Sequence, residues 1–64
     1  MTRAQLRAKI TETLGPVRLR RMAYGGGFRF TDRDPAAAAA MLRGALPGAE
    51  VEASGRSVFV WVTL

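Results

Sequence analysis

The run SVFVWVT, residues 57–63, is the feature that most constrains how this chain can fold. Valines alternate in it with Phe59 and Trp61, so a β-strand formed by this run is apolar on both faces. Such a strand is typical of the centre of a sheet, or of a sheet whose outer face meets another molecule. The sequence therefore predicts a sheet with this run in its interior.

A helix is predicted over residues 3–14. Thr2 and Gln5 have the spacing of a capping box, which satisfies free backbone N–H groups at the start of a helix. Gly15 followed by Pro16 ends the helical pattern. Apolar side chains recur at every fourth position and form a narrow stripe: Leu6, Ile10 and Leu14.

A second helix is predicted after Asp34, with this residue as the N-cap and Pro35 in the first helical position. The alanines of residues 36–40 favour a helix, and their small side chains would let it lie close to a sheet. Pro47 followed by Gly48 ends the pattern. The side chains expected to be buried are Ala38, Met41, Leu42, Ala45 and Leu46.

Alternation of polar and apolar residues predicts three more strands, at residues 17–24, 28–31 and 49–53. The alternation slips at Arg20-Arg21, where a β-bulge would explain it. Ser54-Gly55-Arg56 is interpreted as the turn that leads into the central run.

The three glycines of Gly25-Gly26-Gly27 have two interpretations. A phosphate-binding loop would need a helix directly after the glycines, because the helix N-terminus holds the phosphate. A strand at residues 28–31 follows instead. We therefore predict a hairpin turn in which the glycines supply positive φ angles.

The element order αββαββ predicts an α+β fold in a single domain, residues 1–64. It matches the ferredoxin-like order βαββαβ with the first strand moved to the end, which gives an antiparallel sheet of order 1-2-4-3 with both helices on one face. The helix side would carry Val17, Leu19, Phe28, Phe30, Val51, Val58, Val60 and Val62. The open face would carry Arg18, Arg20, Arg29, Glu50, Glu52, Phe59 and Trp61. In the alternative orientation, Phe59 and Trp61 face the helices and the valines face outward.

The composition argues against catalysis. The chain has no cysteine and no histidine, which removes disulfides, thiolate ligands and the commonest general base. Ser54 and Ser57 have no His or Lys near them in sequence to activate them, and the five acidic residues are spread out. We therefore expect no enzyme activity, no cofactor and no bound metal.

Charge is divided unevenly along the chain. Residues 1–33 hold eight basic residues against two acidic ones, whereas residues 34–64 hold two against three. A basic half favours an acidic partner, either a nucleic acid or an acidic protein surface. The residues expected to bind the partner are Arg18, Arg20, Tyr24, Arg29, Phe59 and Trp61.

One resemblance favours a nucleic acid. Residues 58–61, Val-Phe-Val-Trp, resemble the shorter consensus of the RNA-recognition motif, and residues 27–30, Gly-Phe-Arg-Phe, loosely resemble the longer one. That family stacks bases on aromatic side chains of its two central strands. The resemblance implies bases on Phe59 and Trp61 and phosphates on the arginines, although the glutamates of residues 49–53 would repel a phosphate chain.

The other interpretation is protein binding, because a central Phe and Trp rimmed by Arg and Glu are typical of interface hot spots. In size, lack of catalytic residues and composition, the chain resembles small proteins of phages and mobile elements in GC-rich bacteria, of which anti-CRISPR inhibitors are the best-known group. The resemblance implies docking on a Cas protein or nucleoprotein complex and steric inhibition of it. We expect a monomer in the bacterial cytoplasm with no membrane partner, since the sequence lacks a signal-peptide pattern and any run of about 20 apolar residues.

Overall fold

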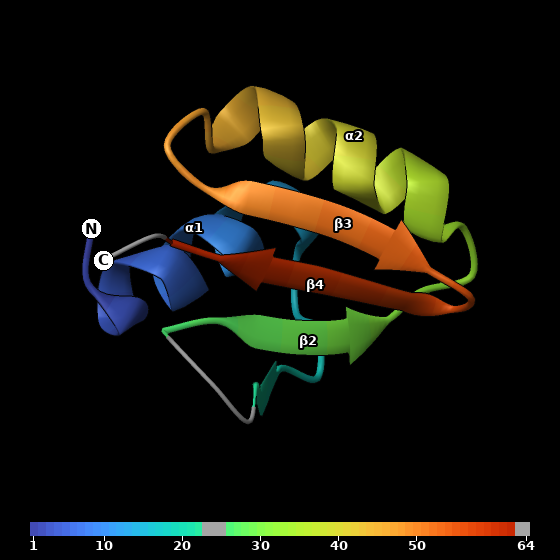
Figure 1. The fold of residues 1–64 in the computed structure, drawn as a ribbon, viewed down its shortest axis with the longest axis horizontal. Coiled ribbons are helices and arrows are strands. Elements are labelled where there is room, and N and C mark those ends of the chain that lie inside the picture. The colour runs from blue at the N-terminus through green and yellow to red at the C-terminus, as the bar shows by residue number, and fades with distance from the viewer. Residues whose placement is uncertain (23–25, 63–64) are drawn as a thin grey trace.

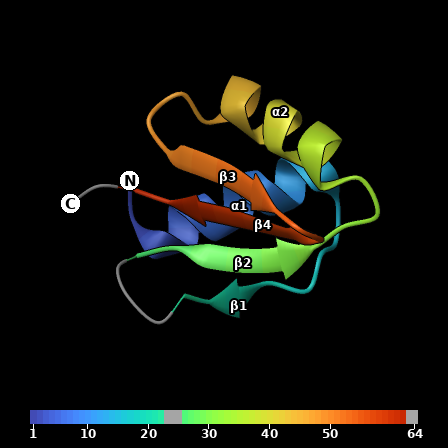
Figure 2. The same ribbon diagram turned by 45° about the vertical axis from the view of Figure 1, so that its right-hand side comes forward.

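The last strand, β4 (Ser57–Trp61), lies inside a four-stranded antiparallel sheet, as the sequence predicts. The computed structural model describes residues 1–22 and 26–62, and the order of the sheet is β1-β2-β4-β3. The other elements are α1 (Arg3–Leu14), β1 (Arg20–Arg21), β2 (Phe28–Thr31), α2 (Pro35–Ala45) and β3 (Glu50–Ser54). Both helices cover the same face of the sheet (Figures 1 and 2), so the predicted α+β fold is confirmed.

The core is a single apolar layer between the sheet and the helices. Phe28 and Phe30 of β2 pair with Val60 and Val58 of β4, and all four side chains are almost fully buried. The helices add Leu6 and Ile10 from α1, and Ala38, Ala39, Leu42 and Leu46 from α2 and its C-cap. Four other side chains predicted to face the core are only partly buried and pack against this layer: Leu14, Val17, Leu19 and Val51.

The predicted helix ends are confirmed. Thr2 Oγ1 accepts from the Gln5 N–H at 3.2 Å, and Gln5 Oε1 accepts from the Thr2 N–H at 2.8 Å. Gly15 ends α1 with a φ of 81°. Asp34 Oδ1 accepts from the Ala37 N–H at 3.2 Å, so α2 starts from the predicted cap.

The predicted buried stripe of α2 is partly wrong. Met41 is 53% exposed and Ala45 is also exposed, whereas Ala39 is fully buried. Leu42 and Leu46, one helical turn apart, set the centre of the buried stripe. Because successive residues are about 100° apart around a helix, Met41 then points outward and the small Ala39 lies against the core.

The first strand is much shorter than predicted. Only Arg20–Arg21 of the expected 17–24 strand is paired, and the pairs Arg20↔Arg29 and Arg21↔Phe28 are consecutive, so the predicted bulge is absent. Arg21 lies on the helix side of the sheet, opposite Phe28, yet it remains exposed at the sheet edge. The slip in alternation therefore reflects an edge position that tolerates a charge on either face.

The final hairpin is close to the prediction. β3 begins and ends one residue later than expected, and β4 ends at Trp61 rather than Thr63, which lies outside the described residues. Ser54 pairs with Ser57, leaving a two-residue turn in which Gly55 has a φ of 61°. Glycine at the first central position is the placement of a type II′ turn.

The hairpin predicted between β1 and β2 is confirmed by their antiparallel pairing, but Gly27 acts differently from the prediction. Neither Gly26 nor Gly27 has a positive φ, and Gly25 lies outside the described residues. A Cβ at position 27 would lie 2.5 Å from Val60 O, 2.6 Å from Trp61 Cβ and 2.7 Å from Met22 Sδ. Gly27 is therefore needed for close approach to β4 and not for backbone conformation.

Candidate binding face

The open face of the sheet, opposite the helices, is organised in rows that cross the strands. The first row runs from β1 to β3 through Arg20, Arg29, Phe59 and Glu52, each directly paired with the next. Directly paired residues of antiparallel strands project from the same face. This row therefore places two arginines, one aromatic ring and one carboxylate side by side.

Two further rows flank the first. In one, Glu50 pairs with Trp61, which lies next to Gly27, and the Met22 N–H donates to Gly27 O at 3.2 Å. In the other, Ser57 of β4 pairs with Thr31 on one side and Ser54 on the other. The open face is thus basic over β1 and β2, aromatic over β4 and acidic over β3.

The structure decides which way the aromatic side chains face. Val58 and Val60 are 0% exposed and lie in the core, whereas Phe59 and Trp61 are half-buried on the open face. The alternative orientation, with the aromatics against the helices, is therefore wrong. Both rings have a glutamate directly across the β3–β4 pair.

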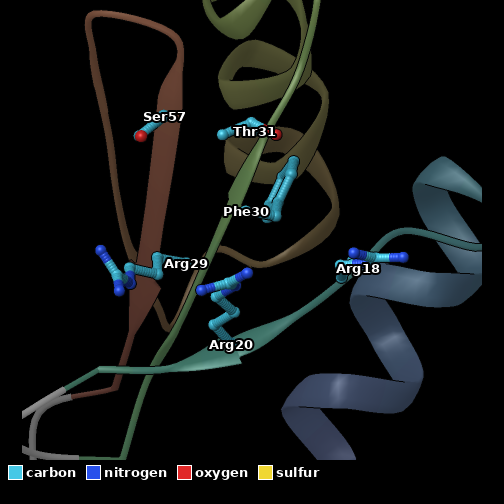
Figure 3. Close-up of a pocket in the computed structure, with 6 residues that line it drawn as sticks. All are labelled: Arg18, Arg20, Arg29, Phe30, Thr31 and Ser57. Atoms are coloured by element: carbon cyan, nitrogen blue, oxygen red, sulfur yellow. The ribbon is translucent and has the colours of Figure 1, made fainter.

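The three arginines predicted to bind a partner line one hollow. It has a volume of about 290 Å³ and is lined by Arg18, Arg20, Arg29, Phe30, Thr31 and Ser57. Figure 3 shows the Arg20 and Arg29 side chains next to each other, with Arg18 apart from them. Like charges paired directly across strands repel each other.

No described group neutralises this cluster. Within residues 1–22 and 26–62, the guanidinium groups of Arg18, Arg20 and Arg29 make neither a hydrogen bond nor an ion pair. All three residues are exposed. The hollow is therefore suited to receive a carboxylate or phosphate from a partner.

Four residues of the site were not predicted from the sequence. Thr31 and Ser57 line the hollow, and Gly27 and Met22 complete the row of Trp61. Counting residues back from the turn at Gly55 would have paired Ser57 with Ser54. The sequence holds no comparable signal for which residues of β2 pair with β1 and β4. Tyr24, also predicted to bind a partner, lies outside the described residues.

A second group of basic side chains lies on the helix side of the β1 edge. The Arg7 guanidinium carbon is 5.5 Å from the centroid of the Phe28 ring, close enough for a cation–π contact. A hollow of about 430 Å³ there is lined by Arg3, Ala4, Arg7, Arg21 and Phe28. Arginines thus flank the β1 edge on both faces of the sheet.

Comparison with models of known protein families gave no match, and comparisons with curated proteins and with solved structures gave no significant match. In the part of the chain that the structure describes, no three His, Cys, Asp or Glu side chains are grouped as ligands for a metal ion. No helix in that part is long and apolar enough to cross a membrane.

Proposed function

We propose that this chain is a small non-enzymatic binding protein that docks on another protein through its open face. The observation that carries the proposal is the order of side chains across the first row: Arg20, Arg29, Phe59 and Glu52. An aromatic centre with charges of both signs at its rim is how protein interfaces are composed.

The position of the glutamates favours a protein over a nucleic acid. Glu52 lies directly opposite Phe59, and Glu50 directly opposite Trp61. Bases stacked on these rings would bring their phosphates close to two carboxylates, which repel them. A protein surface can match both signs of charge at once.

Docking of this kind acts by occupying a surface. The anti-CRISPR type of inhibitor expected from the sequence is one form of it, in which the surface belongs to a Cas protein or nucleoprotein complex. The arginines Arg18, Arg20 and Arg29 support this form, because they offer several cations to a surface that is acidic or carries nucleic acid. This role remains a prediction.

Photo-crosslinking tests whether the open face binds protein. Thr31 is exposed on the open face and Met41 is exposed on α2, so each can be replaced by benzoylphenylalanine without entering the core. We expect irradiation of living bacterial cells to give a protein adduct from position 31 and none from position 41. Adducts of equal yield from both positions, or none from position 31, would contradict the proposal.

Oligonucleotide binding separates the two classes of partner. The strong positive charge predicts weak, salt-sensitive binding to DNA in any case. We expect Trp61→Ala to leave this affinity unchanged, as measured by fluorescence anisotropy at ~50 and ~200 mM salt. A base stacked on Trp61 would instead contribute about 1–3 kcal/mol, so a loss of about fivefold or more would favour the nucleic-acid function.

A further inference from the structure

We infer that the open face is complementary to itself, and that the protein it binds is a second copy of this chain. The inference rests on the proposed function, since it takes the open face to be a protein-binding surface. It adds the identity of the partner. It follows from the registers of the three strand pairs and from the sign of the charges that they place side by side.

The order of charges selects one symmetry. In this symmetry, the open faces of two copies meet, and a two-fold axis relates the copies. The axis lies in the plane of contact, parallel to the strands and midway between β2 and β4. This rotation exchanges left and right across the sheet, so β1 of one copy lies over β3 of the other, and β2 lies over β4. The basic side of each face then meets the acidic side of its copy.

The first row gives the contacts that follow. Arg20 on β1 faces Glu52 of the other copy, and the symmetry makes this ion pair twice. Arg29 on β2 faces the ring of Phe59 of the other copy, which allows a cation–π contact. The pair of arginines that repel each other within one chain would each gain a favourable partner.

The row of Trp61 adds an apolar contact. The same rotation places Trp61 over Gly27 of the other copy, a buried position that the Met22 sulfur of that copy covers. A thioether next to an aromatic ring is a favourable contact. The aromatic ring of each copy thus meets the Met22 side chain of the opposite face.

The other symmetry that joins the two faces is unfavourable. A two-fold axis in the plane of contact but perpendicular to the strands places β1 over β1 and β3 over β3. Arg20 would then face arginine, and Glu52 would face glutamate. Pairing along the free edge of β3 is also hindered, because Arg43 Nε and Nη2 donate to Val51 O at 3.3 and 3.0 Å.

The size of the face predicts a moderate affinity. Four strands about 4.8 Å apart, of which the longest have five residues of about 3.4 Å each, give a face of at most roughly 19 by 17 Å. This lies below the area of about 800 Å² per partner that is typical of stable complexes. We therefore expect a weak, transient dimer, in place of the monomer expected from the sequence.

Charge reversal provides the test, with sedimentation velocity from about 5 to 500 µM, a range that brackets the affinity of a small interface. We expect the unmodified chain to dimerise, and Arg20→Glu or Glu52→Arg alone to weaken the dimer on the order of a hundredfold, because like charges then face each other. An equimolar mixture of the two variants restores both ion pairs. It should form a 1:1 heterodimer about as stable as the original.

Two variants control for net charge. Lys9 and Glu12 are exposed on α1, away from the open face, so Lys9→Glu and Glu12→Arg change the total charge by the same amounts. Neither should alter dimerisation. Circular dichroism of all four variants checks that each is folded.

The outcomes keep this inference separate from the proposed function. A chain that remains monomeric at every concentration, or a mixture of charge-reversed variants that does not associate, would overturn the inference. If the chain is monomeric and position 31 still cross-links to a different protein, the open face is a docking surface for that protein. If neither association nor an adduct occurs, both proposals fail.

Discussion

Replacing Leu42 by alanine is expected to lower the midpoint of thermal unfolding by roughly 10–30 °C. Leu42 is 0% exposed in the centre of the buried stripe of α2. Removing a buried leucine side chain typically costs about 2–5 kcal/mol, because the cavity is only partly filled by relaxation. A chain of 64 residues has a free energy of unfolding of roughly 3–10 kcal/mol in total.

The measurement is circular dichroism at 222 nm during heating and in urea. Met41→Ala is the matched control, since it removes a side chain of similar size from the adjacent, 53% exposed position of the same helix. We expect its midpoint to stay within a few degrees of the original. Equal losses in the two variants would mean that α2 is rotated relative to the structure described above.

Gly27→Ala is expected to destabilise the fold by roughly 1–3 kcal/mol, the usual cost of forcing an extra group into a packed site. The new methyl group would lie 2.5 Å from Val60 O, and this carbonyl belongs to the backbone of the central strand. Met22 sulfur could move aside, but Val60 cannot move without disturbing the pairing of β2 with β4.

Gly26→Ala is the control for this prediction. Its new methyl group would lie 4.0 Å from Val62 Cγ2, an ordinary contact, so the free energy of unfolding should change by less than about 0.5 kcal/mol. Urea unfolding gives this energy, and the fluorescence of the single tryptophan, Trp61, reports the local change. Identical stability of the two variants would show that the close contacts at Gly27 relax at no cost.

The sequence is most informative where local chemistry determines the structure. The capping residues Thr2 and Asp34 locate the helix starts, and the double apolar pattern of residues 57–63 places β4 inside the sheet. The strand order then follows from the element order. With it, alternation predicts which residues share a face of the sheet, but it leaves two orientations open for Phe59 and Trp61, and the structure selects the outward one.

The sequence is least informative where packing between elements determines the structure. Met41 and Ala39 are both compatible with a buried stripe, and only the contact of α2 with the sheet selects Ala39. The length of β1 depends on how far β2 extends beside it. The role of Gly27 depends on Val60 and Trp61, which are more than thirty residues away in sequence.

The order of charges across the open face also gives the sheet an electric polarity. Arg20 and Glu52 are at opposite ends of a row that crosses three strand spacings, about 14 Å. This exceeds the screening length of about 8 Å at physiological salt, so each end attracts its own counterpart nearly independently. A charged molecule that approaches this face is therefore oriented by electrostatic attraction before the two surfaces come into contact.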